Sequence, residues 1–156
     1  MSYDTNVIKS NLSSLRIQGE NIVLGAKLYG YAIYESLEYK ISSRTLINIK
    51  NGKTIRLGET KARLFNYLLA CSEKEFISDD EIFINVFEKN GLRCSRAYLW
   101  AMIRKLHFAF LSVGHEQAPL QRYEHKGYQV DFESVVEIYI ALKTKRTTTR
   151  DEEDKH

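Results

Sequence analysis

The cationic side chains in the second half of the chain are the residues best suited to chemistry with an anionic partner. Between Arg93 and Lys126 the chain holds six Arg or Lys residues against two acids. Cations meet the phosphates of double-stranded DNA, and a slim, rigid element can enter its major groove. The sequence offers two such groups, Arg96, Arg104 and Lys105, and then Arg122, His125 and Lys126. This pattern predicts a protein that binds double-stranded DNA.

The distribution of charge supports this prediction, because the net charge of +3 is too small to do so. The segment from Glu73 to Lys89 holds six acids against two Lys residues, and the basic stretch follows it directly. Such asymmetry allows one face of the molecule to concentrate positive potential. Two oppositely charged, solvated faces without a nucleic-acid partner would produce the same pattern, and they are the alternative.

Metal binding and catalysis find no support in the sequence. Cys94 and the His residues 107, 115 and 125 lack the spacing of metal ligands. The acids Asp79–Glu81 are explained by a helix N-terminus, where negative charge opposes the helix dipole. Neither a glycine-rich phosphate loop nor a nucleophile elbow is present. We therefore expect no enzyme activity, no metal and no cofactor.

Two consecutive helices are predicted, each with an apolar face, and the second carries the first basic group. The pattern Ser78–Glu81 is a capping box, so one helix should begin at Asp79 and end near Gly91. Its apolar residues are Ile82, Phe83, Val86 and Phe87. The other helix should run from Ser95 to Leu111, after a loop that contains Arg93. Its inward residues are Leu99, Ile103, Leu106 and Phe110, and its outward residues are Arg96, Trp100, Arg104, Lys105 and His107.

Strands and a further helix are predicted before these two helices. Residues 45, 47 and 49 are Thr, Ile and Ile, and they alternate with other residues along an expected strand. Asn51-Gly52 favours a tight turn into the next strand. A helix is expected over 59–72, with an apolar stripe that packs in the core. That stripe consists of Leu64, Phe65, Leu68 and Leu69.

The second basic group is predicted to form the tip of a hairpin. Residues 120–123 and 128–130 flank the turn 124–127, which ends on glycine. A short helix is expected beyond Asp131, through residues 135–140, and the charged, Thr-rich segment 143–156 should be disordered. The expected organisation is an extension of unassigned role at 1–30, a domain at 31–132, and the short helix with its tail at 133–156.

Neither a signal peptide nor a membrane span is predicted. Residues 1–30 lack a basic start followed by an apolar run. The apolar stretch Val135–Leu142 is too short to cross a bilayer and contains Glu137. We expect a cytoplasmic protein, unless the chain is a piece of a longer, membrane-anchored one.

The order of helix, short turn, basic helix and hairpin resembles the DNA-binding domains of the OmpR/PhoB class, and most closely the ToxR/CadC-like branch. The likeness covers roughly Tyr39 to Val130. Leu57 followed by Ala62–Phe65 looks like the family's first helix, and Ile103–Leu106 sits where the family has Ile-x-x-Leu-Arg. Residues 120–130, which contain Gly-Tyr-Gln, are similar to its C-terminal hairpin. The resemblance implies an α+β fold: a winged helix-turn-helix with an N-terminal antiparallel β-sheet, three helices and a C-terminal β-hairpin wing.

The resemblance also implies a transcriptional regulator that binds double-stranded DNA at specific sequences. The basic helix would enter the major groove, and the wing would lie on the adjacent backbone. Position by position, the DNA contacts would be Arg96, Tyr98, Trp100, Met102, Arg104, Lys105 and His107 on the helix, and Arg122, His125 and Lys126 on the wing. Arg93 would contact RNA polymerase, and two copies would bind direct-repeat sites as a homodimer.

Two questions stay open at the level of sequence. Arg96 and Arg104 can pair with guanine edges or with phosphates. Trp100 and Met102 are unusual on a groove-facing surface: they can contact thymine methyls, pack against the domain, or meet a protein partner. Together with His107 on the same helix and Glu124 in the hairpin, they support a second hypothesis. In it the chain is a winged-helix protein-interaction module that modulates another regulator and binds DNA weakly or not at all.

Overall fold

The computed structural model of the chain describes residues 25–142, which fall into two parts. The larger part is 29–138 and holds the helices and the hairpin wing. Of the smaller part, 25–28 and 139–142 are described, and there the amide of Leu142 donates to the carbonyl of Gly25 (2.5 Å). The disordered tail expected at 143–156 lies outside the described residues, as does most of the expected extension. No helix among residues 25–142 is long and apolar enough to cross a membrane.

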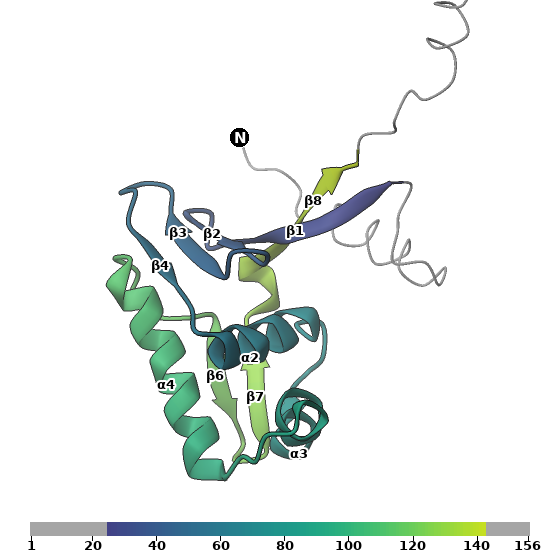
Figure 1. Cartoon of the computed structure of the whole chain (residues 1–156). Helices are drawn as coiled ribbons and strands as arrows, with labels where there is room; N and C mark the ends of the chain where they lie inside the picture. Colours follow the sequence, from purple (N-terminus) through teal and green to yellow (C-terminus); the bar gives the residue numbers. More distant parts are fainter. Residues whose placement is uncertain (1–24, 143–156) are drawn as a thin grey trace, which may run out of the picture. The chain divides into compact units, whose positions relative to one another are not determined.

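Four antiparallel strands precede the helices, as predicted, and a fifth strand that follows the wing joins the same sheet (Figure 1). Its strand order is β4-β3-β2-β1-β8. The bounds are β1 Ala26–Ile33, β2 Leu37–Lys40, β3 Thr45–Asn48, β4 Thr54–Arg56 and β8 Val135–Ala141. The register pairs Tyr31 with Tyr39, and Tyr39 in turn with Leu46. These three side chains are buried, so one face of the sheet enters the core.

Helix α2 (Glu59–Ala70) has the predicted apolar stripe and packs beside α4 (Arg96–Ser112). The ring of Phe65 lies at the centre of this packing. It meets Tyr39 with ring centroids 4.9 Å apart and Phe110 with centroids 5.8 Å apart, both edge to face. Aromatic pairs in this geometry stabilise a core beyond the area that they bury. The core of the larger part therefore lies where the sheet, α2 and α4 meet.

The capped acidic helix starts where the capping box predicts. Helix α3 (Asp79–Ile82) follows Ser78, whose hydroxyl accepts the amide of the third helical residue (3.1 Å). It continues as a π-helical turn, η1 (Phe83–Phe87), and a 3-10 turn, η2 (Glu88–Asn90). The helical run ends at Gly91, whose φ of 72° lies in the left-handed region that terminates helices.

Helix α4 has a hydroxyl cap and the predicted inward stripe. The side-chain oxygen of Ser95 accepts the amide of Tyr98 (3.1 Å). The buried residues are Leu99, Met102, Ile103, Leu106, Ala109 and Phe110. The four predicted residues are among them, and Met102 and Ala109 widen the stripe.

The turn between β3 and β4 is held against the end of α4. The side-chain amides of Asn48 and Asn51 both donate to the carbonyl of Val113, at 2.9 and 3.0 Å. This contact explains why the alternation at residues 45, 47 and 49 does not mark the inward face of β3. Leu46 and Asn48 are buried instead, and Ile49 is exposed. A polar side chain is tolerated in the core here because its hydrogen bond is satisfied.

The C-terminal hairpin forms a wing with a three-stranded sheet of order β5-β7-β6. Its strands are β5 Ile77–Ser78, β6 Leu120–Tyr123 and β7 Gly127–Val130. The tip turns through Glu124 and His125, which have positive φ angles of 41° and 58°. With this wing, the predicted combination of an antiparallel sheet, three helices and a C-terminal hairpin is confirmed (Figure 1).

The prediction of a short helix through residues 135–140 is wrong, because this segment belongs to the strand β8. A single 3-10 turn, η3 (Phe132–Ser134), precedes it. The sequence Val-Val-Glu-Ile-Tyr-Ile is rich in β-branched and aromatic residues, which favour strands, and β1 is its neighbour in the sheet. Since β1 begins at Ala26, strand structure extends beyond both limits of the domain expected at 31–132.

The wing depends on a glycine where β7 approaches β5. A Cβ at Gly127 would lie 2.0 Å from the carbonyl oxygen of Ile77 and 2.8 Å from the Cα of Ser78. Gly127→Ala should therefore force the two strands apart and lower the free energy of unfolding by about 1–3 kcal/mol, the usual range for overpacking. Denaturant titration measures this change. Gly58→Ala is the control for added bulk, since a Cβ there meets nothing within 4 Å and only the preference of the α2 N-cap for glycine over alanine is lost. Equal stability of the two variants would contradict the close approach.

Candidate nucleic-acid interface

The outer face of α4, opposite its buried stripe, begins with cations. Arg96, Arg104 and Lys105 are exposed, and none of them forms a salt bridge with any residue in the range 25–142. Trp100 lies among them and is 55% exposed. Because the helix is capped at its start and packed along its length, these side chains project from a fixed backbone. They are available to an anionic partner.

Trp100 and Arg104 form a stacked pair on this face. The guanidinium carbon of Arg104 lies 4.7 Å from the centre of the Trp100 ring. The two residues are four positions apart, which brings their side chains together on one side of a helix. A guanidinium over an indole face is favourable, and the contact restricts where the guanidinium points. Trp100 is therefore not a core residue, and its ring orients Arg104.

Two residues of the expected contact set are turned away from the outer face. Met102 is 4% exposed and belongs to the core, because positions 102, 106 and 109 share the inward side of the helix. His107 is half-buried, and its Nδ1 accepts a hydrogen bond from the amide of Ala118 (3.2 Å). Burial lowers the pKa of its imidazole. The expectation that His107 faces outward is corrected: it anchors the segment that leads into the wing.

Tyr98 is placed between the helix and the acidic helical run. Its side chain is 44% exposed, and its ring packs edge-on against Phe87, with centroids 5.9 Å apart. Part of its surface therefore stays open to a partner, while the rest joins α4 to η1. Arg93 is exposed in the loop that connects the two helices.

On the wing, Arg122 is held by an internal ion pair. Its Nη1 and Nη2 donate to the two carboxylate oxygens of Asp79, at 2.6 and 2.7 Å, and Nη2 also donates to the carbonyl of His125 (2.9 Å). Its guanidinium stacks on the ring of Tyr128, 4.8 Å from the ring centre. The side chain of Asp79 is only 6% exposed. Arg122 therefore fixes the wing to the start of α3, and its charge is already compensated.

Asp79 is the residue of this site that reasoning from sequence does not find. The helix dipole accounts for an acid at this position, yet the side chain turns inward. The available signal is spacing, because Asp79 precedes the buried Ile82 and Val86 by three and seven positions. A carboxylate on the inward side of a helix needs a cation, and the fold brings Arg122 to it.

His125 and Lys126 are exposed at the tip of the wing. The Nζ of Lys126 lies 3.4 Å from a carboxylate oxygen of Glu124, and both side chains are 62% exposed. Such exposed pairs contribute little and exchange partners readily. The tip therefore presents a cation that can move to a phosphate.

The start of α4 and the wing meet around a notch of about 290 Å³. Its lining consists of Asp79, Arg96, Ala97, Leu99, Trp100, Arg122 and Tyr128. The structure thus brings Arg96 and Trp100 beside the tethered base of the wing. This arrangement makes one continuous candidate interface from the first half of α4 and the wing.

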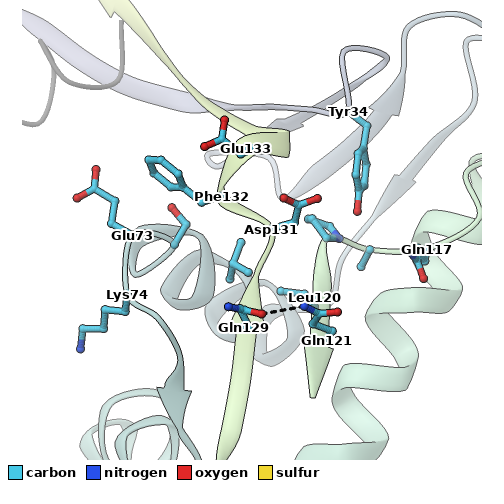
Figure 2. A pocket seen from close by; sticks show the side chains of 14 residues that line it. Tyr34, Glu73, Lys74, Gln117, Leu120, Gln121, Gln129, Asp131, Phe132 and Glu133 are labelled. Atoms are coloured by element: carbon cyan, nitrogen blue, oxygen red, sulfur yellow. Dashed lines mark hydrogen bonds between the residues drawn. The ribbon is translucent and has the colours of Figure 1, made fainter. Parts of the chain in front are cut away.

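A second cavity, of about 370 Å³, lies between the end of α2, the start of β6 and the end of β7 (Figure 2). Figure 2 shows the side chains of Gln121 and Gln129, joined by a hydrogen bond of 2.8 Å, at its edge. Its lining includes three acids, Glu73, Asp131 and Glu133, and one cation, Lys74, which is paired with Glu81. Acidic side chains repel phosphate, so this cavity does not belong to the candidate DNA interface.

Removal of Arg122 would leave the carboxylate of Asp79 buried without its cation. Arg122→Ala should lower the free energy of unfolding by about 1–3 kcal/mol, the cost of an unsatisfied buried group. Lys126→Ala is the matched control, because its exposed pair with Glu124 contributes little. Chemical denaturation of both variants measures the difference. If Arg122→Ala were no less stable than Lys126→Ala, the ion pair would not hold the wing.

Comparison with known proteins supports the fold at low sequence identity. No protein-family model and no curated protein matches the chain. The DNA-binding domain of E. coli CadC is similar in structure, with a TM-score of 0.54 and 15% identity over 72% of this chain and 96% of that one. The C-terminal domain of the nisin resistance regulator NsrR, a lantibiotic response regulator, has a TM-score of 0.50 and 13% identity over 64% and 95%. The chain therefore has the fold of OmpR/PhoB-type winged helix domains.

Proposed function

We propose that this chain is a transcriptional regulator that binds double-stranded DNA at specific sequences. The first half of α4 enters the major groove, and the wing rests on the adjacent backbone. The observation that carries the proposal is a set of three exposed cations, Arg96, Arg104 and Lys105, on a capped helix beside the wing. The DNA-binding domain of CadC supports the proposal, because it has a similar fold.

The length of the charged part of α4 fits this role. No Lys or Arg occurs between Lys105 and the end of the helix at Ser112. From Arg96 to Lys105 the helix rises about 14 Å, at 1.5 Å per residue. The major groove is about 12 Å wide. The charged half of α4 alone is therefore long enough to fill the groove.

The surroundings of the two arginines suggest different contacts. Arg104 is held by Trp100 and keeps the edge of its guanidinium available, which is the geometry for two hydrogen bonds to guanine O6 and N7. Arg96 lies at the notch beside the wing, where the adjacent backbone would pass, and is assigned to phosphate. Lys126 at the wing tip meets a second phosphate of the same strand.

Two further parts of the proposal rest on the family resemblance. Arg93, exposed in the loop before α4, contacts RNA polymerase bound beside the site. Two copies occupy direct-repeat half-sites one helical turn apart, on the same face of the duplex. Arg93→Ala should then reduce transcription activation more than DNA binding.

The salt dependence of the DNA affinity reports contacts to phosphate, and its dependence on DNA sequence reports contacts to bases. Arg122 is compensated internally, so Arg96, Arg104, Lys105 and Lys126 supply the phosphate and groove charges. The logarithm of the affinity should fall against the logarithm of salt concentration with a slope of roughly −3 to −4. Fluorescence anisotropy with a duplex selected from a random pool, and with a base-substituted duplex, measures both dependences.

A matched pair of substitutions distinguishes reading from anchoring. Lys126→Ala should make the salt slope shallower by about one and leave the preferred sequence unchanged. Arg104→Lys keeps the charge but loses the planar fork, so it should keep the slope and reduce discrimination between the two duplexes by about 1–3 kcal/mol. If Arg104→Lys left both the slope and the discrimination unchanged, Arg104 would be assigned to phosphate. No salt-dependent binding to any duplex would overturn the proposal and favour the protein-interaction module.

A further inference from the structure

The second half of α4 carries large apolar side chains on its outer face. Phe108 is 58% exposed and Leu111 is 56% exposed, and a spacing of three residues places them on one side of the helix. Arg104 and Lys105 precede Phe108 by four and three positions, so positive charge borders this apolar surface. Neighbouring aromatic and aliphatic side chains that are exposed and rimmed by charge are typical of protein contacts.

The turn after β3 lies beside the end of α4 that carries this surface. Asn48 and Asn51 hold the turn against Val113, at the end of α4. Ile49 lies between them and is 62% exposed, and the exposed Lys50 follows it. We define the α4–hairpin face by its five residues, Ile49, Lys50, Lys105, Phe108 and Leu111. The hairpin in this name is the one formed by β3 and β4, not the wing.

The segments that build the α4–hairpin face contain cations and no acids. From Tyr39 to Gly58 the chain has five Lys or Arg residues and neither Asp nor Glu. From Lys89 to His115 the count is the same. An occupant of this face must therefore bring apolar surface bordered by negative charge, because like charges at a contact are strongly unfavourable.

The chain itself carries a surface of that kind. Asp80, Ile84 and Glu88 recur every four residues along α3, η1 and η2, and all three are exposed, Ile84 to 46%. We define them as the acidic face. Within residues 25–142 neither Asp80 nor Glu88 takes part in a salt bridge. The segment that contains them, from Glu73 to Glu88, holds six acids and one Lys.

We infer that a second copy of this chain docks its acidic face on the α4–hairpin face. Ile84 of one copy packs on Phe108 and Leu111 of the other. Asp80 and Glu88 then approach the cations that border Phe108. Each face has an apolar centre with charge on either side, and the signs are opposite. Apolar burial supplies the affinity, and the charges set the register and exclude other pairings.

This contact goes beyond the proposed function and does not require DNA. The notch beside the wing lies at the start of α4, and the cations of the helix end at Lys105. Phe108 and Leu111 lie about 4.5 and 9 Å further along the helix than Lys105, the last cation assigned to DNA. The apolar side chains assigned to the second copy therefore lie beyond the part of α4 assigned to DNA, and Lys105 is shared by the two surfaces.

The two faces lie on different elements, so the contact joins unlike surfaces. Two copies close into a pair if each uses both faces, and extend into a chain if each contact is made with a new copy. Either way the contact is small and bordered by exposed charge. It should be weak and sensitive to salt.

Sedimentation velocity of the full chain without DNA tests the inference. The weight-average sedimentation coefficient should rise between about 10 μM and about 1 mM protein, the range for a small transient interface. Ile84→Lys and Phe108→Glu should each abolish the rise. An equimolar mixture of the two variants should restore it, because each variant keeps one face intact. Leu92→Lys alters an exposed apolar residue outside both faces (38% exposed) and should associate like the wild type.

Three results would overturn the inference: a wild type that stays monomeric at every concentration, single variants that associate like the wild type, or a mixture that stays monomeric. Circular dichroism checks the fold of each variant, and Leu111→Glu replaces Phe108→Glu if that variant unfolds. Ile84 lies outside α4 and the wing, so Ile84→Lys should keep the affinity for a single half-site within about twofold. Monomeric wild type with intact DNA binding rejects the self-association alone, whereas self-association without DNA binding rejects the proposed function alone.

Discussion

The ion pair between the buried carboxylate of Asp79 and the partly exposed guanidinium of Arg122 is the interaction on which the candidate interface depends. It joins the start of α3 to the wing, while the guanidinium also stacks on Tyr128 and binds the carbonyl of His125. Removing a carboxylate from water costs several kcal/mol unless a cation and hydrogen bonds replace its hydration. The wing therefore cannot leave α3 without exposing or stranding this charge. The close approach of β7 to β5 at Gly127 adds a second, steric constraint in the same place.

With the wing fixed, α4 presents two halves of different chemistry. Its first half combines cations with Trp100 and stands beside the notch, and its second half is apolar outside and held by the β3–β4 turn. Electrostatic attraction to phosphate acts on the first half alone. The second half offers exposed apolar side chains, which suit contact with a protein. One rigid helix can therefore serve two partners at different positions along its axis.

Local signals predicted much of this fold, and distant partnerships account for the parts that they missed. The Ser78 cap and the inward stripe of α4 depend on residues within one or two helical turns, and both are present as predicted. Asn48 is buried because Val113 accepts its hydrogen bond from 65 positions away. Asp79 is buried because Arg122 reaches it from 43 positions away. The segment 135–140 carries residues that favour a strand, and pairing with the distant strand β1 completes it. Spacing within a segment cannot reveal such partners.

The central claim is that the first half of α4 and the tip of the wing bind DNA together. Backbone amide chemical shifts of the isotope-labelled chain, followed while a duplex selected from a random pool is added, test it most directly. We expect the shifts to concentrate at Arg96–Lys105 and at 124–126, while Asp80–Glu88 stays unchanged. Shifts centred on Phe108–Leu111 without change at Arg96–Lys105, or no shifts at saturating duplex, would contradict the account.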